Sequence, residues 1–165
     1  MEKKLRLSGY DYSQNGAYFI TLCTWRRNYF LSAVGRDDLG APALQLTDYG
    51  RIVERYIRTI PDAYPNVTLS NYVVMPNHVH LLLLVSGDGA PGSSRPTKKI
   101  YPRATQLVPR IVASLKRFSN RDVGFDLWQE SYHDHIIRTE QDFLDIWNYI
   151  AGNPSRWSED VYYEP

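Results

Sequence analysis

Two histidines in one short apolar run are the first residues whose types and spacing could do chemistry. His78 and His80 are separated by one residue in HVHLLLLV, residues 78–85. Side chains alternate between the two faces of a strand, so both imidazoles should point the same way. A neutral imidazole offers a nitrogen lone pair, and two of them on one strand are the start of a divalent metal site. Histidine pairs at this spacing also occur as core or surface residues, and the pair alone leaves that alternative open.

A tyrosine and an asparagine near the end of the chain have helical spacing. Tyr149 and Asn153 are four residues apart, which on a helix places them on one face, about 5–6 Å from each other. Asn153 could add a carbonyl oxygen to the two imidazoles, and such a set with open positions suits Mg²⁺ or Mn²⁺ bound together with a phosphate oxygen. Because Asn153 precedes Pro154, we expect its backbone to be biased away from helical geometry. A helix C-cap is its alternative role.

The segments around these residues resemble a known family. The string MPNHVHLL, Met75 to Leu82, resembles the histidine–hydrophobic–histidine (HUH) motif of single-tyrosine transposases, and specifically of the REP-associated tyrosine transposases, which are related to small bacterial insertion sequences. A second block resembles the C-terminal pattern of that family in order and spacing: Leu127-Trp128-Gln129, His135 with Ile137-Arg138, Tyr149-Ile150 and Asn153-Pro154. The resemblance extends from the first predicted strand to Arg156.

The resemblance implies a DNA endonuclease and transposase that acts on single-stranded or hairpin DNA. The histidine pair of the motif corresponds to His78 and His80, the nucleophile to Tyr149, and the third metal ligand to Asn153. With a divalent metal, Mg²⁺ or Mn²⁺, the tyrosine would attack a phosphodiester and leave a free 3′-hydroxyl and a 5′-phosphotyrosine intermediate. Because the ester is retained, a second 3′-hydroxyl can reverse the step, which makes the reaction DNA recombination by strand transfer. Both monomers and homodimers occur among the relatives.

Other side chains near these motifs have weaker claims to a role. His133 and His135 share one face of a predicted strand and could line the active site, with a structural or DNA-contacting role favoured over metal binding. Tyr132, Tyr162 and Tyr163 are nucleophiles by type, but no side-chain amide follows any of them by four residues on a predicted helix. We therefore expect Tyr149 to be the nucleophile.

Basic residues are concentrated in one stretch of a chain whose net charge is only +1. Between Arg95 and Arg121 there are eight basic residues and no acidic one. Such a run can bind phosphate backbones, although a solvated helix face would look the same. The candidates for DNA binding are Lys98, Lys99, Arg103, Arg110, Lys116, Arg117, Arg121 and, further along, Arg138.

The elements that must position these residues follow from hydrophobic periodicity and turn signals. We predict strands at 17–25, 67–75, 78–85 and 127–138, with Pro76-Asn77 forming a hairpin turn. Helices are predicted from a Thr47 cap to just before Pro61, over 104–119, and from a Thr139 cap to 152. Gly- and Pro-rich residues predict loops at 32–46 and 86–99. The order predicts one α+β domain, 1–165: a ferredoxin-like, split βαβ antiparallel sheet with helices on one face and a C-terminal catalytic helix over the other.

Composition narrows the remaining function classes. Hydrophobic residues make up 43% and charged residues 22%, as in ordinary globular proteins. A single cysteine, Cys23, excludes an intrachain disulfide and a cysteine-based zinc site. The longest apolar run, Leu81 to Val85, is too short to cross a membrane, so we expect a cytoplasmic, nucleoid-associated protein.

Three other functions stay open on the sequence. An HUH replication initiator or relaxase is disfavoured by the absence of a helicase or oligomerisation domain. A DNA-binding module derived from such a transposase, without catalysis, would keep the fold and lose the chemistry. A zinc hydrolase is disfavoured because no HExxH motif accompanies the histidines.

Overall fold

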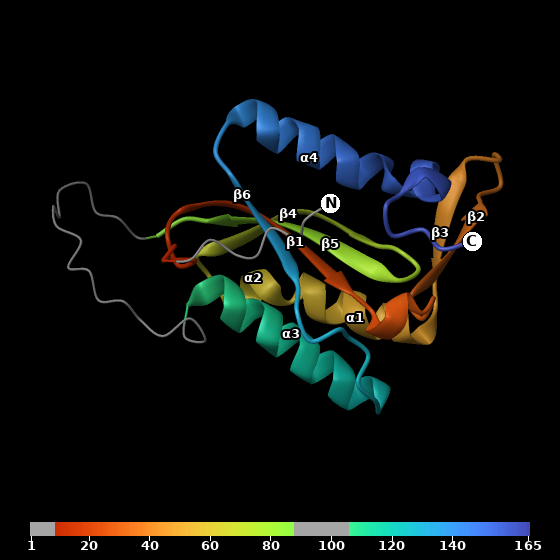
Figure 1. Cartoon of the computed structure of the whole chain (residues 1–165), viewed down its shortest axis with the longest axis horizontal. Coiled ribbons are helices and arrows are strands. Elements are labelled where there is room, and N and C mark those ends of the chain that lie inside the picture. The colour runs from red at the N-terminus through yellow and green to blue at the C-terminus, as the bar shows by residue number, and fades with distance from the viewer. Residues whose placement is uncertain (1–8, 88–105) are drawn as a thin grey trace, which may run out of the picture.

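The computed structural model describes residues 9–87 and 106–165, and an antiparallel sheet lies at its centre (Figure 1). Its four strands stand in the order β4-β5-β1-β6. The strands are β1 (Gly16–Cys23), β4 (Val67–Val74), β5 (His78–Val85) and β6 (His133–Ile137). Helix α1 (Asp48–Arg58) connects β1 to β4, and α3 (Leu107–Val123) precedes β6. This is the α+β, ferredoxin-like split βαβ arrangement that the sequence predicted.

The helices cover the two faces of the sheet unequally. In Figure 1, α1, the short α2 (Ile60–Ala63) and α3 lie below the sheet, and α4 (Glu140–Gly152) lies above it. Alternate residues of β5 follow this division. Val79, Leu81 and Leu83 pack in the larger core, between the sheet and helices α1 and α3, whereas Leu82 belongs to the smaller core between the sheet and α4. The period-two pattern therefore places His78 and His80 on the α4 face.

Strand register places all four histidines of the chain on that face. Across β1 and β5, Cys23 lies opposite His78 and Thr21 opposite His80. Across β1 and β6, Thr21 lies opposite His133, and Phe19 opposite His135. Directly opposed residues in an antiparallel pair project to the same side. The metal-ligand candidates His78 and His80 and the lining candidates His133 and His135 therefore share one face of the sheet.

Capping residues set the helix starts where the sequence predicted them. The Thr47 hydroxyl accepts a hydrogen bond from the backbone N–H of Gly50 at 3.0 Å, and that of Thr139 accepts from Asp142 at 3.1 Å. Each satisfies one of the unpaired donors of a helix N-terminus. Both predicted caps are confirmed.

Helix α3 is longer than predicted, and its proline is accommodated. It begins at Leu107, so Pro109 lies in the first turn, where the missing N–H has no helical acceptor to lose. Its end lies four residues beyond the predicted Ser119, because Gly124 adopts a left-handed conformation (φ 91°) that terminates a helix readily. Residues 104 and 105 of the predicted helix lie outside the described residues.

Two predictions about extended segments were wrong. Residues 32–46 are not a loop but a hairpin of β2 (Ser32–Arg36) and β3 (Pro42–Leu46). The Asp37 carboxylate accepts from the backbone N–H groups of Leu39 and Ala41, so an Asx-type turn closes the two strands. Within 127–138 only His133–Ile137 is a strand, and Trp128 forms a single bridge with Thr24.

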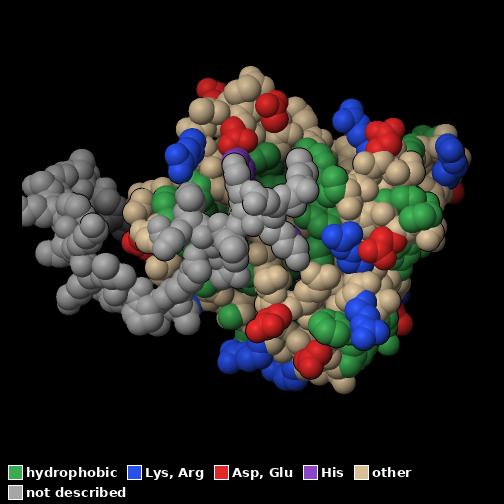
Figure 2. All heavy atoms as spheres, viewed as in Figure 1, with side chains coloured by type: hydrophobic (Ala, Val, Ile, Leu, Met, Phe, Trp, Pro, Cys, Tyr) green, Lys and Arg blue, Asp and Glu red, His purple; other side chains and the backbone are tan. Residues whose placement is uncertain are grey.

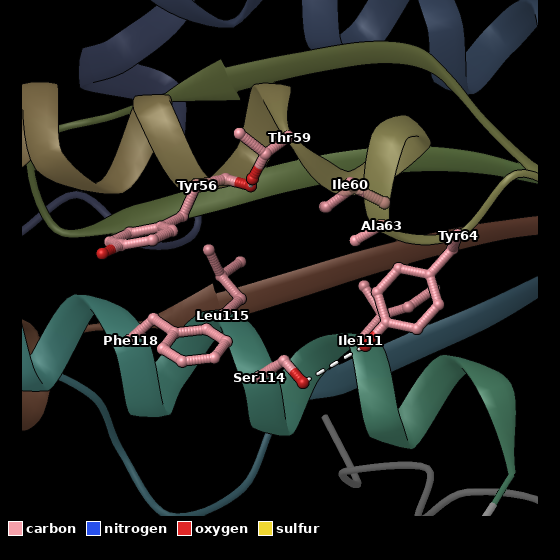
Figure 3. A pocket seen from close by; sticks show the side chains of 9 residues that line it. All are labelled: Tyr56, Thr59, Ile60, Ala63, Tyr64, Ile111, Ser114, Leu115 and Phe118. Carbon is pink, nitrogen blue, oxygen red and sulfur yellow. Dashed lines mark hydrogen bonds between the residues drawn. The ribbon is translucent and has the colours of Figure 1, made fainter.

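Helices α1 and α2 pack on α3 around a small apolar hollow (Figure 3). Tyr56 and Phe118 stack across it with ring centroids 5.7 Å apart, and the Tyr64 hydroxyl lies 3.2 Å from the Ser114 hydroxyl. This layer stabilises the sheet from the side away from the histidines. Among the described residues, no helix combines the length and the apolar character needed to cross a membrane.

Candidate active site

His78 and His80 form the centre of the candidate site. Their Nε2 atoms lie 3.1 Å apart, and the side chains are 0% and 1% exposed. Burial lowers the pKa of His78 to about 4, against opposing effects of the Asp160 carboxylate and the Asn153 side chain. Burial, together with the neighbouring His78, also holds the pKa of His80 well below its usual value. Both rings are therefore neutral near pH 7 and keep a nitrogen lone pair for a cation.

The other nitrogen of each ring has its own partner. Nδ1 of His78 lies 2.9 Å from Oδ1 of Asn77, and Nδ1 of His80 lies 2.8 Å from the hydroxyl of Thr21. When Nδ1 donates to an oxygen, the lone pair is on Nε2, the nitrogen that faces the other ring. Partners of this kind fix the orientation of metal-binding histidines. The sequence did not single out Thr21 or Asn77.

Helix α4 carries Tyr149 to the same face. The Tyr149 ring lies 5.3 Å from the ring of His80 and 6.2 Å from that of Phe19, measured between centroids. Burial and the Asp160 carboxylate raise the pKa of the Tyr149 hydroxyl, so it is protonated near neutral pH. Tyr149 is nevertheless 39% exposed, in contrast to the histidines. A hydroxyl that faces both the histidine pair and solvent can meet a substrate phosphate.

Asp160 is a further polar residue at this site that sequence reasoning missed. Its Oδ2 accepts hydrogen bonds from the Tyr149 hydroxyl at 3.3 Å and from Nδ2 of Asn153 at 2.5 Å. Single ligand atoms from His78, His80 and Asp160 all lie within 4.8 Å of one another. In the sequence Asp160 is one of several acidic residues of a polar tail. Only the fold of the short helix η3 (Asn153–Glu159) returns it to the tyrosine.

Asn153 lies at the junction of α4 and η3, and its backbone corrects one prediction. Its angles are helical (φ −58°, ψ −42°), so the expected bias away from helix before Pro154 is wrong. The chain continues directly into η3, and Pro154 occupies the first turn of that helix, where a proline is tolerated. The side chain is 2% exposed. Its Oδ1 has no hydrogen-bond partner among the described residues.

Aromatic residues after α4 cover the histidines. The ring of Tyr162 lies 4.5 Å and that of Trp157 5.9 Å from the ring of His78. Asn77 donates to the backbone carbonyl of Tyr162 at 2.7 Å. This bond ties residues 161–165, which we call the covering segment, to the turn before β5. Tyr162 and Trp157 thus shield the imidazole of His78, which is 0% exposed.

The two lining candidates on β6 stand at the edge of this face. Nε2 of His135 lies 2.8 Å from Oδ2 of Asp142, in the first turn of α4, and so ties the helix to the strand. His133 lies opposite Thr21, in the same row as His80. His135 thus contacts α4 rather than the histidine pair.

Four of the eight basic candidates lie away from the site. Arg110, Lys116, Arg117 and Arg121 belong to α3, on the opposite face of the sheet. The ammonium group of Lys116 donates to the carbonyls of Gln129, Glu130 and Ser131 at 2.7, 3.0 and 3.2 Å, which holds the loop before β6.

The last of the α3 candidates, Arg121, forms an ion pair with Asp122. Outside α3, Arg138 is exposed. Lys98, Lys99 and Arg103 lie outside the described residues. On the face seen in Figure 2, basic side chains of the described part stand singly or in pairs, with acidic ones between them, rather than in one continuous patch.

Comparison with known proteins finds two similar sequences and a similar solved structure. No family model matches the sequence. An uncharacterised protein of Haemophilus influenzae is 31% identical over 175 residues, covering 98% of this chain and 92% of that protein. A second Haemophilus influenzae protein, described as a putative REP-associated tyrosine transposase, is 24% identical over 149 residues, which cover 87% of this chain and 73% of that protein.

A solved structure agrees in fold. The structure of a REP-associated tyrosine transposase bound to a REP hairpin superposes with a TM-score of 0.63 at 18% identity, covering 93% of this chain and 74% of that one. The strand order, the helix over the histidine face and the similarity to these proteins agree with the two motifs of the sequence. The chain is thus similar in sequence to a putative REP-associated tyrosine transposase and in fold to a REP-associated tyrosine transposase of known structure.

Proposed function

We propose that this protein cleaves and rejoins single-stranded, hairpin-associated DNA through a covalent bond to Tyr149. The observation that carries the proposal is the position of the Tyr149 hydroxyl. It lies beside the buried histidine pair and donates to an oxygen of Asp160 that Asn153 also contacts. Nucleophile, proton acceptor and cation ligands thus come from one sheet face, one helix and the segment after it.

The donor set fits a divalent cation. His78 and His80 supply two neutral nitrogens, and Asp160 supplies a carboxylate oxygen within ligand range of both. The buried Oδ1 of Asn153, which has no hydrogen-bond partner among the described residues, would be a fourth ligand oxygen, since a buried acceptor without a partner is otherwise costly. Mixed nitrogen and oxygen ligands of this kind suit Mn²⁺ or Mg²⁺. Bound there, the cation would withdraw charge from a scissile phosphate and orient it.

The chemistry of the chain itself starts from a protonated phenol. An attack on phosphorus requires the hydroxyl proton to leave, and Oδ2 of Asp160 is its hydrogen-bond acceptor. As the bond from the tyrosine oxygen to phosphorus forms, the bond from phosphorus to the 3′-oxygen breaks. That oxygen takes up a proton, from the carboxyl of Asp160 or from water, and leaves as a 3′-hydroxyl. The DNA keeps its phosphate as a 5′-phosphotyrosine. Attack by another 3′-hydroxyl reverses the sequence and releases Tyr149.

The DNA class follows from the family. One relative of known structure is bound to a REP hairpin, and Tyr149 is exposed enough to meet an unpaired strand. We infer that the substrate is a hairpin with a single-stranded flank that contains the scissile phosphate.

The test is the capture of the covalent intermediate. Purified protein is incubated with a 3′-labelled hairpin carrying a single-stranded flank and Mn²⁺ or Mg²⁺, and denaturing gels then resolve free DNA from DNA attached to protein. Wild type should give the adduct, and Tyr149→Phe should not. Tyr49→Phe is the matched control, since Tyr49 is 38% exposed, as Tyr149 is at 39%, and belongs to α1 in the opposite layer. This control should react like wild type.

Further arms separate catalysis from binding. EDTA and His78→Ala should each abolish the adduct while leaving hairpin binding measurable by anisotropy. Stable binding by wild type without an adduct in either metal would show a DNA-binding module instead. An adduct that persists in Tyr149→Phe would assign the nucleophile to another residue.

A further inference from the structure

A turn at the end of β1 exposes a large aromatic ring. The short helix η1 (Trp25–Arg27) follows β1, and the Trp25 side chain is 52% exposed. The guanidinium carbon of Arg26 lies 5.7 Å from the centroid of the indole. An isolated exposed aromatic is unremarkable on a protein surface. Here, however, the ring stands between a basic side chain and a cleft.

The backbone of this turn is unusual. Arg26 and Arg27 both have positive φ angles, 51° and 55°, in a region that residues other than glycine seldom enter. Among the described residues they are the only non-glycine residues with positive φ. Backbone in sparsely populated regions tends to occur where geometry serves function. Here the Arg26 guanidinium lies over the Trp25 ring, whereas that of Arg27 lies near the ring of Tyr162.

A cleft of about 510 Å³ opens beside the indole. Besides Trp25, its lining includes Asn120, Asp126, Gln129 and Glu130. Lys116 and Trp128 complete the lining. The amide of Asn120 is already bonded to Asp126 and to the backbone N–H of Leu127. The carboxylates of Asp126 and Glu130 and the amide of Gln129 can accept hydrogen bonds from ring N–H and amino groups of a nucleobase. Stacking on an aromatic ring combined with polar groups at the edge is how proteins hold unpaired bases.

The cleft is joined to the candidate active site through the same turn. Trp25 donates its backbone N–H to Leu127 at 2.8 Å, and Gln129 donates to Cys23 at 2.9 Å. Cys23 pairs with His78 in the sheet. On the other side of the turn, the guanidinium carbon of Arg27 lies 5.5 Å from the centroid of the Tyr162 ring. That ring packs against the ring of His78. Arg27 therefore faces the histidines, and Trp25 faces the cleft.

We propose that the cleft beside Trp25 binds one unpaired nucleobase of the strand that contains the scissile phosphate. The base stacks on the indole, the neighbouring backbone phosphates lie near Arg26 and Arg27, and the cleft carboxylates favour bases that carry an amino group. The inference rests on the proposed function, because it places this subsite on the same strand. It adds a specificity contact that lies outside the catalytic group.

The test measures binding, so that it does not depend on the cleavage reaction. Dissociation constants are measured by anisotropy for a labelled hairpin with a single-stranded flank, using the full chain with Mn²⁺. Trp25→Ala should raise Kd about 5- to 100-fold, the range for loss of one stacked base, and Trp25→Phe should restore most of the affinity. Tyr49→Ala removes an exposed aromatic of α1 that does not line the cleft and should leave Kd within about twofold.

A scan with abasic nucleotides locates the base. Replacing successive flank nucleotides by abasic ones should reveal one position at which wild type loses affinity and Trp25→Ala loses no more. Equal Kd values for wild type and Trp25→Ala, or an effect of the substitution that is the same at every abasic position, would overturn the proposal. If Trp25→Ala does not fold, the wild-type minus Trp25→Phe fluorescence difference on titration replaces it, and an unchanged difference counts against the subsite.

The failure of this proposal can be told from that of the proposed function. If wild type forms the covalent adduct and binds the hairpin, but Trp25 has no influence, only the cleft assignment falls. If wild type neither binds the DNA nor forms an adduct, the proposed function falls and the cleft assignment with it.

Discussion

The hydroxyl of Tyr149 in α4 donates to Oδ2 of Asp160 at 3.3 Å, although Asp160 stands eleven positions later, directly after the end of η3. The same oxygen accepts from Asn153. Asp160 thus links the candidate nucleophile to Asn153, a candidate cation ligand. Asp160 is itself a candidate ligand, because its carboxylate lies close to the ring nitrogens of His78 and His80.

Asp160→Asn should therefore weaken both metal binding and reaction. The substitution keeps the size of the side chain but removes the negative charge that would attract a cation and receive a proton. Loss of a ligand or of its close partner typically costs about 10- to 100-fold in metal affinity, so we expect Mn²⁺ affinity, measured by calorimetry, to fall by that amount and adduct formation to slow. Glu159→Gln removes a neighbouring exposed charge and is the control. Unchanged Mn²⁺ affinity in Asp160→Asn would exclude Asp160 as a ligand.

Removal of the covering segment should open the histidine pair. The ring of Tyr162 packs against that of His78, and its backbone carbonyl accepts a hydrogen bond from Asn77. Glu164 forms an ion pair with Arg27 at 3.6 Å. A chain that ends at Asp160 keeps the candidate ligands but loses the ring over His78. We expect faster modification of histidine by diethyl pyrocarbonate and faster adduct formation with hairpin DNA. The tethering substitution Asn77→Ala should produce a smaller effect in the same direction. Histidine modification at the wild-type rate in the truncated chain would show that the segment does not limit access.

Much of the fold could be predicted because local signals were strong. The run of 78–85 has alternating faces and a Pro-Asn turn before it, and the strand has those same bounds, His78–Val85. Thr47 and Thr139 precede well-patterned helices, and both act as caps. The hairpin of β2 and β3 was missed because Gly35, Gly40 and Pro42 indicate a loop when taken one at a time. Only the Asp37 turn and the pairing between the strands show otherwise.

The candidate site was predictable only in part for a different reason. Strand and helix periodicity placed His78, His80, Tyr149 and Asn153, because their relations are local in sequence. Asp160 and Tyr162 reach the site through η3 and through contacts with Asn77, 85 residues away from Tyr162. The bond that holds Tyr162 ends on its backbone carbonyl, and a carbonyl has no signature in residue type. Lys116 shows the same effect, since its ammonium group is held by three carbonyls of another loop.

Gly50 should be intolerant of any side chain. A Cβ at this position of α1 would lie 1.9 Å from the carbonyl oxygen of Leu31, a backbone atom that cannot rotate away. Gly50→Ala should cost at least the roughly 1–3 kcal/mol of overpacking in a tight core, measured as the urea-unfolding free energy. Gly152→Ala is the matched control in α4, where a Cβ would meet nothing within 4 Å. That change should be neutral or stabilise by about 0.4–1 kcal/mol. Similar stabilities for the two variants would show that α1 can shift away from Leu31.

Tyr18 should limit stability at alkaline pH. Its side chain is fully buried in the larger core, and its hydroxyl donates to the carbonyl of Gln14 at 2.7 Å. Burial, reinforced by Tyr10, raises the pKa of Tyr18 above that of a free tyrosine. Above about pH 10 the unfolded chain loses this proton while the folded chain keeps it, so the folded state binds more protons and stability falls as pH rises. The contribution is complete below pH 10 and declines above it.

Tyr18→Phe separates the two effects of that hydroxyl. At pH 7 it removes a buried hydrogen bond and should cost about 1 kcal/mol. Between pH 10 and 12 it should flatten the decline of the urea midpoint, because the buried group can no longer titrate; other tyrosines with raised pKa values, such as Tyr72, keep part of the slope. Tyr49→Phe, at an exposed position, should change neither quantity by more than a few tenths of a kcal/mol. A decline as steep in Tyr18→Phe as in wild type would mean that alkaline unfolding starts elsewhere in the molecule.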